Sequence, residues 1–268
     1  MSVLSMLRLL SFMLLLQTAG ACAAAWTQDE GAWQLISGVI SSDADRSFDD
    51  GSRAVPALFQ RQLLQNDIEY GWTGSLTLLA RTETAYVRTR SNGVPVSEVN
   101  NAFEGGARYL LARGPGLVGA DDVLSVEGSV RTAGAFNFAY SANADSGGQD
   151  GGLRLLYGSG FRLWDRDGFV DFEAGYRWVS RPRPDQMPVD LTAGLWLAPR
   201  WMVMVQSFNL FSGAATAPYV PFRMHKLELS GAWKLTQRLT LQAGAFLSPA
   251  GRNALDERGL CLSVWADF

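Results

Sequence analysis

The segment LCLSVWADF, residues 260–268, alternates between apolar and mostly polar residues. Its apolar positions are Leu260, Leu262, Val264, Ala266 and Phe268. The residues between them are Cys261, Ser263, Trp265 and Asp267. A period of two is typical of a β-strand with two different faces. Because most chains end in a polar, frayed tail, a strand that continues to Phe268 suggests that the last residues have a role of their own.

Residues 1–25 have the layout of a secretory signal peptide. Arg8 precedes an apolar run at residues 9–16, and small residues follow, with Ala-x-Ala patterns that end at Ala23 and Ala25. The apolar run is too short to span a bilayer as a helix. We therefore expect export and cleavage after Ala23 or Ala25, with a buried N-terminal helix as the alternative. Cys22 follows Ala-Gly-Ala, so the sequence leaves its lipidation open.

The composition excludes several classes of protein. Hydrophobic residues make up 47% of the chain, yet the mean hydropathy is only +0.01. The formal net charge of −3 becomes −4 when Arg8 is removed, and this mild acidity argues against a nucleic-acid partner. Removal of Cys22 leaves Cys261 as a single cysteine, so no internal disulfide can stabilise the exported chain.

The remainder of the chain divides into twelve alternating segments of the length that a tilted strand needs to cross a bilayer. We expect strands at about 31–43, 58–70, 75–90, 102–113, 122–133, 151–164, 169–180, 187–198, 201–211, 223–235, 238–248 and 257–268. Short connectors, at 71–74, 165–168, 199–200 and 236–237, alternate with longer ones at 47–56, 91–101, 133–151, 180–186, 212–222 and 248–256. This alternation is typical of outer-membrane barrels. The sequence predicts an all-β fold, a twelve-stranded antiparallel up-and-down transmembrane β-barrel over residues 26–268, with both ends on the short-turn side.

The two faces of these segments differ in polarity. Segment 169–180 places Val170, Phe172 and Trp178 on one face and Asp171 and Glu173 on the other. A soluble sandwich would bury the apolar face, whereas a barrel in lipid turns it outward. The alternation alone allows both, and a soluble secreted β protein remains an alternative.

The tryptophans favour the barrel. Eight of the nine lie near the short-turn ends or the N-terminus, as in an aromatic girdle at one membrane interface. Three of them, Trp164, Trp196 and Trp265, are in the inward register and are candidates to fill the lumen.

Three stretches resemble known barrels. IEYGWTGSLTL, residues 68–78, is similar to a periplasmic hairpin of outer-membrane barrels. Residues 29–51 resemble the first strand and loop of uncharacterised proteobacterial outer-membrane barrels, a family similar to the phenol-degradation, MetA-pathway-like transporter group. The C-terminal strand with its final Phe268 resembles the signal that Gram-negative barrels present to their assembly machinery. The resemblance implies an outer-membrane location, and it transfers no functional residue.

The inward register contains ionisable residues of both signs, which we expect to line the lumen. These residues are Arg81, Glu83, Glu104, Arg108, Glu127, Arg131, Arg154, Arg162, Asp171, Glu173, Arg177, Asp190, Lys226 and Glu228. They could line a narrow selective pore, or they could pair and close the lumen. Inward glycines favour the pore because they would leave room; they are Gly158, Gly160, Gly175, Gly194 and Gly244.

Other chemistry is weakly supported. GPGLVG at 114–119 matches a dinucleotide fingerprint but is followed by a strand, so we expect a hairpin turn. DRDG at 165–168 reads as a tight turn because Tyr176 stands where a calcium loop needs Glu. His225 could belong to an outer-membrane phospholipase-like site, but Leu227 stands where the serine would be. We expect no catalytic residue, cofactor or metal site.

The sequence therefore predicts a non-enzymatic outer-membrane barrel that passively transports small solutes, with aromatic or amphipathic solutes as candidates. Its partners would be outer-membrane lipids, the barrel-assembly machinery and the solute. The alternatives are a non-transporting structural or interaction barrel that works through its extracellular loops, and an outer-membrane lipid-modifying enzyme.

Overall fold

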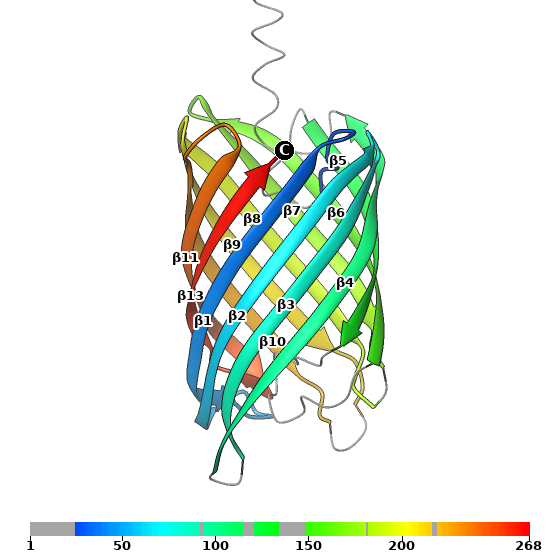
Figure 1. Cartoon of the computed structure of the whole chain (residues 1–268). Coiled ribbons are helices and arrows are strands. Elements are labelled where there is room, and N and C mark those ends of the chain that lie inside the picture. Colours follow the sequence, from blue (N-terminus) through cyan, green and yellow to red (C-terminus); the bar gives the residue numbers. More distant parts are fainter. Residues whose placement is uncertain (1–24, 92–93, 115–120, 134–147, 181, 216–218) are drawn as a thin grey trace, which may run out of the picture.

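The computed structural model describes residues 25–91, 94–114, 121–133, 148–180, 182–215 and 219–268. The strands are β1 (Trp33–Phe48), β2 (Ala54–Thr73), β3 (Leu76–Ser91), β4 (Val94–Gly114), β5 (Asp121–Ala133), β6 (Gly148–Leu163), β7 (Arg166–Trp178), β8 (Gln186–Ala198), β9 (Trp201–Ser212), β10 (Arg223–Lys234), β11 (Leu239–Arg252), β12 (Ala254–Leu255) and β13 (Arg258–Asp267). Each long strand pairs antiparallel with its sequence neighbours, as Figure 1 shows.

The sheet closes on itself through β1. This strand pairs with β2 from Trp33 to Phe48 and with β13 from Gln34 to Asp43. The two-residue β12 pairs only with the last residues of β1. The fold is thus a closed twelve-stranded antiparallel β-barrel, as predicted. Closure satisfies the backbone groups of the first and last strands, which would otherwise be exposed edges.

The strands extend further than predicted at the end of the barrel that carries the longer connectors, here called the long-loop end. Strand β1 continues to Phe48, β4 begins at Val94 and β11 continues to Arg252. Most of the expected loops 91–101 and 248–256, and half of the expected loop 47–56, are therefore strand. Their polar composition misled the prediction, because backbone pairing continues wherever neighbouring strands can satisfy each other's N–H and C=O groups. The expected loop 133–151 falls mainly outside the described residues, as do residues 115–120 of the GPGLVG stretch and the signal segment up to residue 24.

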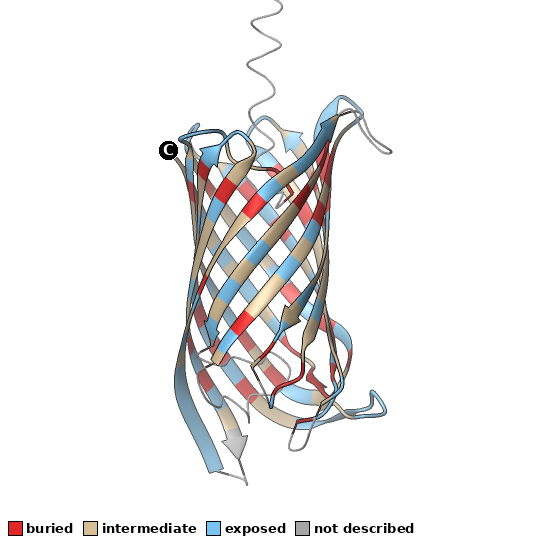
Figure 2. Ribbon diagram, turned by 90° about the vertical axis from the view of Figure 1, so that its right-hand side faces the viewer, coloured by how far each residue is buried: buried red, intermediate tan, exposed pale blue. Residues whose placement is uncertain are grey.

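The outward face of the barrel is apolar. Large side chains that are about half exposed include Leu155, Leu191, Val205, Leu229 and Leu262. Polar side chains such as Ser125, Ser159 and Thr240 are buried. Figure 2 shows that buried and exposed positions alternate along the strands. Apolar outside and polar inside is the arrangement of a barrel in lipid. No helix in the described part of the chain is long and apolar enough to span a bilayer.

Aromatic side chains gather near the opposite end, here called the short-turn end. The C-terminus also lies at this end (Figure 1). The ring centroids of Trp33 and Tyr70 are 4.3 Å apart, and those of Trp201 and Trp233 are 5.3 Å apart and stacked. These outward rings form part of the predicted girdle. Trp164 differs from its expected inward position: it is 84% exposed, because it lies in the tight turn between β6 and β7 rather than within a strand.

Candidate functional site: the barrel lumen

The barrel encloses a cavity of about 410 Å³ that is lined from β1 to β11. Its charged lining residues are Arg61, Arg81, Glu83, Arg131, Asp150, Arg154, Glu173, Arg177, Arg183, Asp190, Lys226 and Glu228. Its apolar lining residues are Ile40, Pro188, Phe208, Leu210, Met224 and Phe246. The cavity therefore combines an ionic surface with an apolar one.

An alternating row of charges crosses five strands of the wall from β2 to β6. In register, Asp67 lies opposite Arg81, Arg81 opposite Glu104, Glu104 opposite Arg131, and Arg131 opposite Asp150. Opposite charges at directly facing positions stabilise a sheet. Arg131 also reaches Glu83 with two hydrogen bonds of 3.0 and 2.6 Å. We call these residues, Asp67, Arg81, Glu83, Glu104, Arg131 and Asp150, the charge ladder.

A second ionic group lies nearer the short-turn end, around the almost fully buried Arg108. Its Nη2 is 3.0 Å from Glu69 Oε1 and 3.0 Å from Glu127 Oε2. Its Nη1 donates a hydrogen bond of 3.0 Å to the carbonyl oxygen of Trp26. Arg108 thereby connects strands β2 and β5 to the chain that precedes β1.

A third ionic group closes the seam where the first and last strands meet. Glu257, in the connection between β12 and β13, lies 2.7 Å from Arg61 Nη2 and also pairs with Lys226. Ser42 donates a hydrogen bond of 2.5 Å to the same carboxylate. Burial alone would raise the pKa of Glu257, but the charges of Arg61 and Lys226 outweigh it and lower that pKa below its ordinary value. Glu257 is therefore held as a carboxylate.

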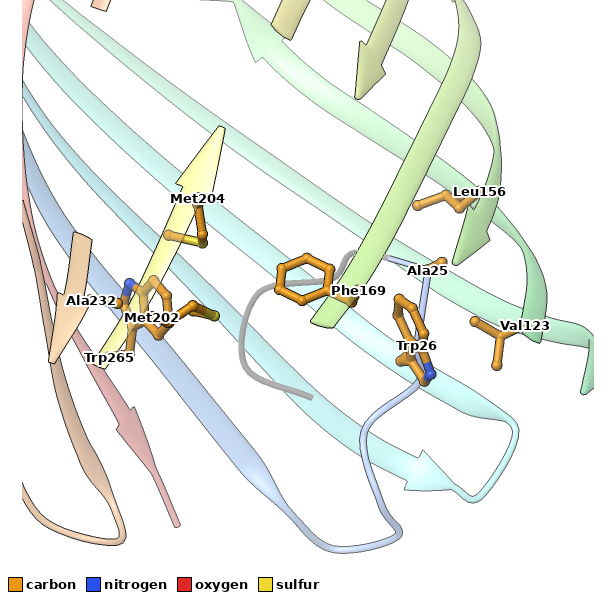
Figure 3. Packing of buried hydrophobic residues seen from close by; sticks show 9 residues of the cluster. All are labelled: Ala25, Trp26, Val123, Leu156, Phe169, Met202, Met204, Ala232 and Trp265. Atoms are coloured by element: carbon orange, nitrogen blue, oxygen red, sulfur yellow. The ribbon is translucent and has the colours of Figure 1, made fainter. Parts of the chain in front are cut away.

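Residues 25–32, here called the N-terminal segment, fold back into the lumen at the short-turn end (Figure 3). The backbone N–H of Ala25 donates to Asp171 at 2.8 Å, and its carbonyl accepts from Ser125 at 2.6 Å. Trp26 packs in an apolar cluster with Val123, Leu156, Phe169, Met202, Met204, Ala232 and Trp265. An apolar cluster thus fills the lumen between the ionic cavity and the short-turn end. The inward positions of Trp196 and Trp265 agree with this cluster.

Two glycines make room for the N-terminal segment. A Cβ atom on Gly71 would lie 1.9 Å from the carbonyl oxygen of Asp29, and one on Gly158 would lie 2.2 Å from the Trp26 ring. The expectation that inward glycines leave an open pore is therefore wrong for Gly158, and it is also wrong for Gly194, whose space the Phe169 ring takes. The Arg154 side chain likewise takes the space beside Gly175, and the Ser230 side chain takes the space beside Gly244.

The wall formed by β8 to β11 differs from the ladder. Asp190 on β8 lies opposite Phe208 on β9, and Glu228 on β10 lies opposite Phe246 on β11. Asp190 accepts a hydrogen bond of 3.1 Å from the backbone of Asn209, and Glu228 accepts one of 3.3 Å from the thiol of Cys261. Among the described residues, neither carboxylate has a cationic nitrogen within 4.0 Å.

The structure brings most of the expected lumen residues together. Nine of the fourteen border the cavity: Arg81, Glu83, Arg131, Arg154, Glu173, Arg177, Asp190, Lys226 and Glu228. Glu104, Arg108, Glu127 and Asp171 also face inward, where they bond to Arg131, Glu69, Arg108 and Ala25 respectively. Arg162 is different: it is exposed at the β6–β7 turn and pairs with Asp167 at 3.2 Å.

Sequence reasoning missed part of the lining. Asp150 and Arg183, which pair at 2.8 Å, fall in stretches that read as loop. Asp150 is four residues before Arg154 and so lies on the same, inward face of β6. Extending the predicted strand toward its N-terminus would have included it. Nothing in the alternation indicates the N-terminal segment, because Ala25 and Trp26 precede the first alternating strand.

His225 lies on the outward face of β10, away from the cavity. Its Nδ1 is 2.8 Å from Asn209 Oδ1, and the Asn209 amide donates to Ser207 Oγ at 3.1 Å. No serine hydroxyl in the described part of the chain hydrogen-bonds to the His225 ring. The nucleophile–base bond of a serine hydrolase is thus missing from this arrangement.

The residues of the expected assembly signal share one face of β13. Leu260, Leu262, Val264 and Phe268 are exposed on the outer surface. The Phe268 backbone exchanges hydrogen bonds with Trp33, with its N–H donating at 2.9 Å and its carbonyl accepting at 3.2 Å. The final residue is therefore part of the seam.

No protein-family model matches the sequence, and no curated protein sequence matches it. The fold is similar to solved outer-membrane barrels. The COG4313 outer membrane channel from Pseudomonas putida F1 has a TM-score of 0.64 at 15% identity, over 91% of this chain and 98% of that chain. The translocator domain of the autotransporter NalP from Neisseria meningitidis has a TM-score of 0.50 at 11% identity, over 97% and 95%. The KdgM porin in complex with disordered oligogalacturonate has a TM-score of 0.50 at 10% identity, over 88% and 99%. At these identities the likeness establishes the fold, which is that of outer-membrane β-barrels.

Proposed function

We propose that the protein is a passive outer-membrane channel for small solutes. The observation that carries the proposal is the cavity of about 410 Å³, lined by charged side chains, inside a closed barrel whose outer face is apolar. A polar lumen in a lipid-facing barrel is the arrangement through which outer-membrane channels pass hydrophilic groups. Export by a signal peptide over residues 1–25 belongs to the same proposal. The fold of the COG4313 channel and of the porin supports it by analogy.

The solutes we favour are aromatic or amphipathic molecules. Such molecules present a polar group and an apolar body, and the cavity offers a surface for each, with the ladder on one wall and Phe208, Leu210, Met224 and Phe246 on the other. Binding sites for such ligands are mostly apolar with a few placed polar groups. The resemblance of the sequence to the phenol-degradation transporter group points in the same direction.

One observation favours a second candidate, a barrel that does not transport. The charge ladder and the Arg108 group pair charges across strands as a brace would, and the N-terminal segment fills the short-turn end of the lumen. In that case the connections at the long-loop end would carry the function. The two candidates differ in one measurable property, which is whether ions and solutes pass.

A matched pair of tryptophan substitutions on β2 separates the candidates. Gln65 lines the cavity, whereas Gln62 is exposed on the outer face three residues away. The purified protein is inserted into planar bilayers, and its single-channel conductance is compared with that of Gln65→Trp and Gln62→Trp. We expect conductance steps for the native protein, a clear reduction for Gln65→Trp because the ring obstructs the cavity, and native steps for Gln62→Trp.

Two results would contradict the channel. Folded protein that produces no conductance steps would favour the non-transporting barrel. Equal conductance for the native protein and both variants would place the ion path outside the cavity. Swelling of liposomes in solutions of small sugars and amino acids provides the same comparison for uncharged and zwitterionic solutes.

A further inference from the structure

We infer that the cavity selects cations over anions, that Asp190 and Glu228 set this preference, and that the preferred solute is a small organic ammonium ion with an apolar body. The inference rests on the proposed channel function, and it adds the sign of the solute and the residues that read it.

The first step is the state of the cations in the cavity. Seven arginine and lysine side chains line it, and within the described residues each has a carboxylate oxygen within 3.6 Å. Arg154, for example, is 2.9 Å from Glu173, and Arg183 is 2.8 Å from Asp150. An anionic solute would have to compete with these carboxylates for every cation that it meets.

The second step is the state of the carboxylates. Glu83, Asp150 and Glu173 are paired, but Asp190 and Glu228 are not within 4.0 Å of a cationic nitrogen of any described residue. Their hydrogen bonds come from uncharged groups: the Asn209 backbone donates to Asp190, and the Cys261 thiol donates to Glu228. The two carboxylates therefore have no direct ion-pair partner among the described residues, although Arg154 and Arg177 attract Asp190, and Lys226 attracts Glu228, from farther away. They leave negative charge in the cavity that these cations offset only in part. Such charges attract cations and repel anions in a narrow pore.

The third step is the apolar surface beside each of these carboxylates. Phe208 lies opposite Asp190 and Phe246 lies opposite Glu228, and all four residues line the cavity. A carboxylate next to an aromatic face suits an ammonium group, because the ring face and the carboxylate both attract positive charge. The protein's own Lys226 ammonium already makes this contact at the Phe246 ring, with Nζ 5.0 Å from the ring centre, so a solute would share that ring with it. Aromatic rings and neighbouring side chains such as Met224 would contact the apolar body of the solute.

The test begins with ion selectivity. The reversal potential in a potassium chloride gradient across a planar bilayer gives the ratio of potassium to chloride permeability. We expect this ratio to be above one for the native protein. Each of Asp190→Asn and Glu228→Gln should lower the ratio about twofold, because each removes one negative charge near the ion path. Asp167→Asn is the matched control, because it removes one carboxylate at the β6–β7 turn, outside the cavity, and should leave the ratio unchanged.

The solute class is tested on the native protein with two probes that share a ring and differ in charge. Benzylammonium chloride and sodium benzoate are compared by the reversal potential under a gradient of each salt. We expect benzylammonium to permeate, or to block the potassium current from one side, and benzoate to do neither. In the double variant Asp190→Asn, Glu228→Gln the difference between the two probes should disappear.

The outcomes separate the inference from the proposed function. Conductance with equal or greater permeability for chloride and benzoate would overturn the inference and leave the channel in place. Folded protein without conductance would overturn both. Conductance that favours potassium and benzylammonium, and depends on Asp190 and Glu228 but not on Asp167, would support the inference. The comparison of the two probes needs no variant, so it holds even if a variant fails to fold.

Discussion

Arg131 holds two carboxylates inside the barrel, Glu83 through two hydrogen bonds and Glu104 at 3.4 Å. Arg108 does the same for Glu69 and Glu127. The removal of one member from such a buried group leaves charges without compensation, which typically costs about 3–5 kcal/mol. At the level of single residues, the barrel should therefore respond much more strongly to the loss of a lumen cation than to the loss of a surface cation.

Replacement of Arg108 should test this directly. Arg108→Ala removes the cation that the partly buried carboxylates of Glu69 and Glu127 share, and it also frees the carbonyl of Trp26. We therefore expect a loss of about 3 kcal/mol in the free energy of unfolding. Arg162→Ala removes an exposed arginine of the same type and should cost less than about 1 kcal/mol. Urea unfolding in detergent micelles, followed by tryptophan fluorescence, measures both. Equal stability for the two variants would show that the Arg108 group does not brace the barrel.

Glu257 predicts a dependence on pH. Its pKa is lower in the folded protein than in the unfolded chain, so the stability that it contributes is present above its ordinary pKa, near 4.5, and is lost as the pH falls through the lower folded value. We expect Glu257→Gln to lower the unfolding free energy at pH 7, and the difference from the native protein to shrink below about pH 4. Unfolding curves for both proteins at a series of pH values measure the difference. A gap that stays constant down to pH 2 would contradict the ionised state of Glu257.

At the level of elements, the strands were predictable and the N-terminal segment was not. The alternation of segments such as 169–180 specifies a strand and its two faces, because a period of two has one geometric meaning. The N-terminal segment has no period, and it is held by contacts to distant strands, such as those of Ala25 to Asp171 and of Gln28 to Thr77. The extensions of β1 up to Phe48 and of β4 back to Val94 were missed because backbone pairing, rather than side-chain pattern, sustains them.

The N-terminal segment should limit the current through the barrel. Trp26 is buried in the lumen, whereas Trp33 is 48% exposed on the outer face. We expect Trp26→Ala to raise the single-channel conductance, because it removes one of the two buried tryptophans of the apolar cluster near the short-turn end. Trp33→Ala, the same substitution outside the lumen, should leave the conductance at its native value. An unchanged conductance for Trp26→Ala would show that Trp26 does not narrow the ion path.

The last strand should matter for assembly more than for stability. The Phe268 side chain is 69% exposed, and its bonds to Trp33 are made by the backbone. We expect Phe268→Ala to reduce the amount of barrel inserted in cells, while protein refolded into detergent unfolds at the native urea concentration. Leu247→Ala, on the outer face of β11, is the control for loss of an exposed apolar side chain. A native level of insertion for Phe268→Ala would remove the assembly role from this residue.

At the level of the whole molecule, the sequence could assign residues to the lumen but could not pair them. The alternation along each strand predicted that Arg131 and Glu83 both face the lumen. The structure brings them within hydrogen-bond distance. Which inward residues meet depends on the register and the closure of the barrel, and neither can be read from one strand at a time. For this reason the paired ladder and the unpaired Asp190 and Glu228 appear only in the closed structure. Arg162 does not line the cavity, because it lies in the last residues of β6, at the short-turn end, where its side chain is exposed.

The claim from which every other one follows is that the barrel sits in the outer membrane with its apolar face toward lipid. The most direct test is to fractionate expressing cells and to run the outer-membrane fraction on SDS gels with and without boiling. We predict that the protein is found in this fraction and that the unboiled form migrates faster than the boiled form, as a closed barrel that resists SDS would. Protein that is soluble in the periplasm and shows no shift would contradict the account, and the residues assigned to the lumen would then be its surface.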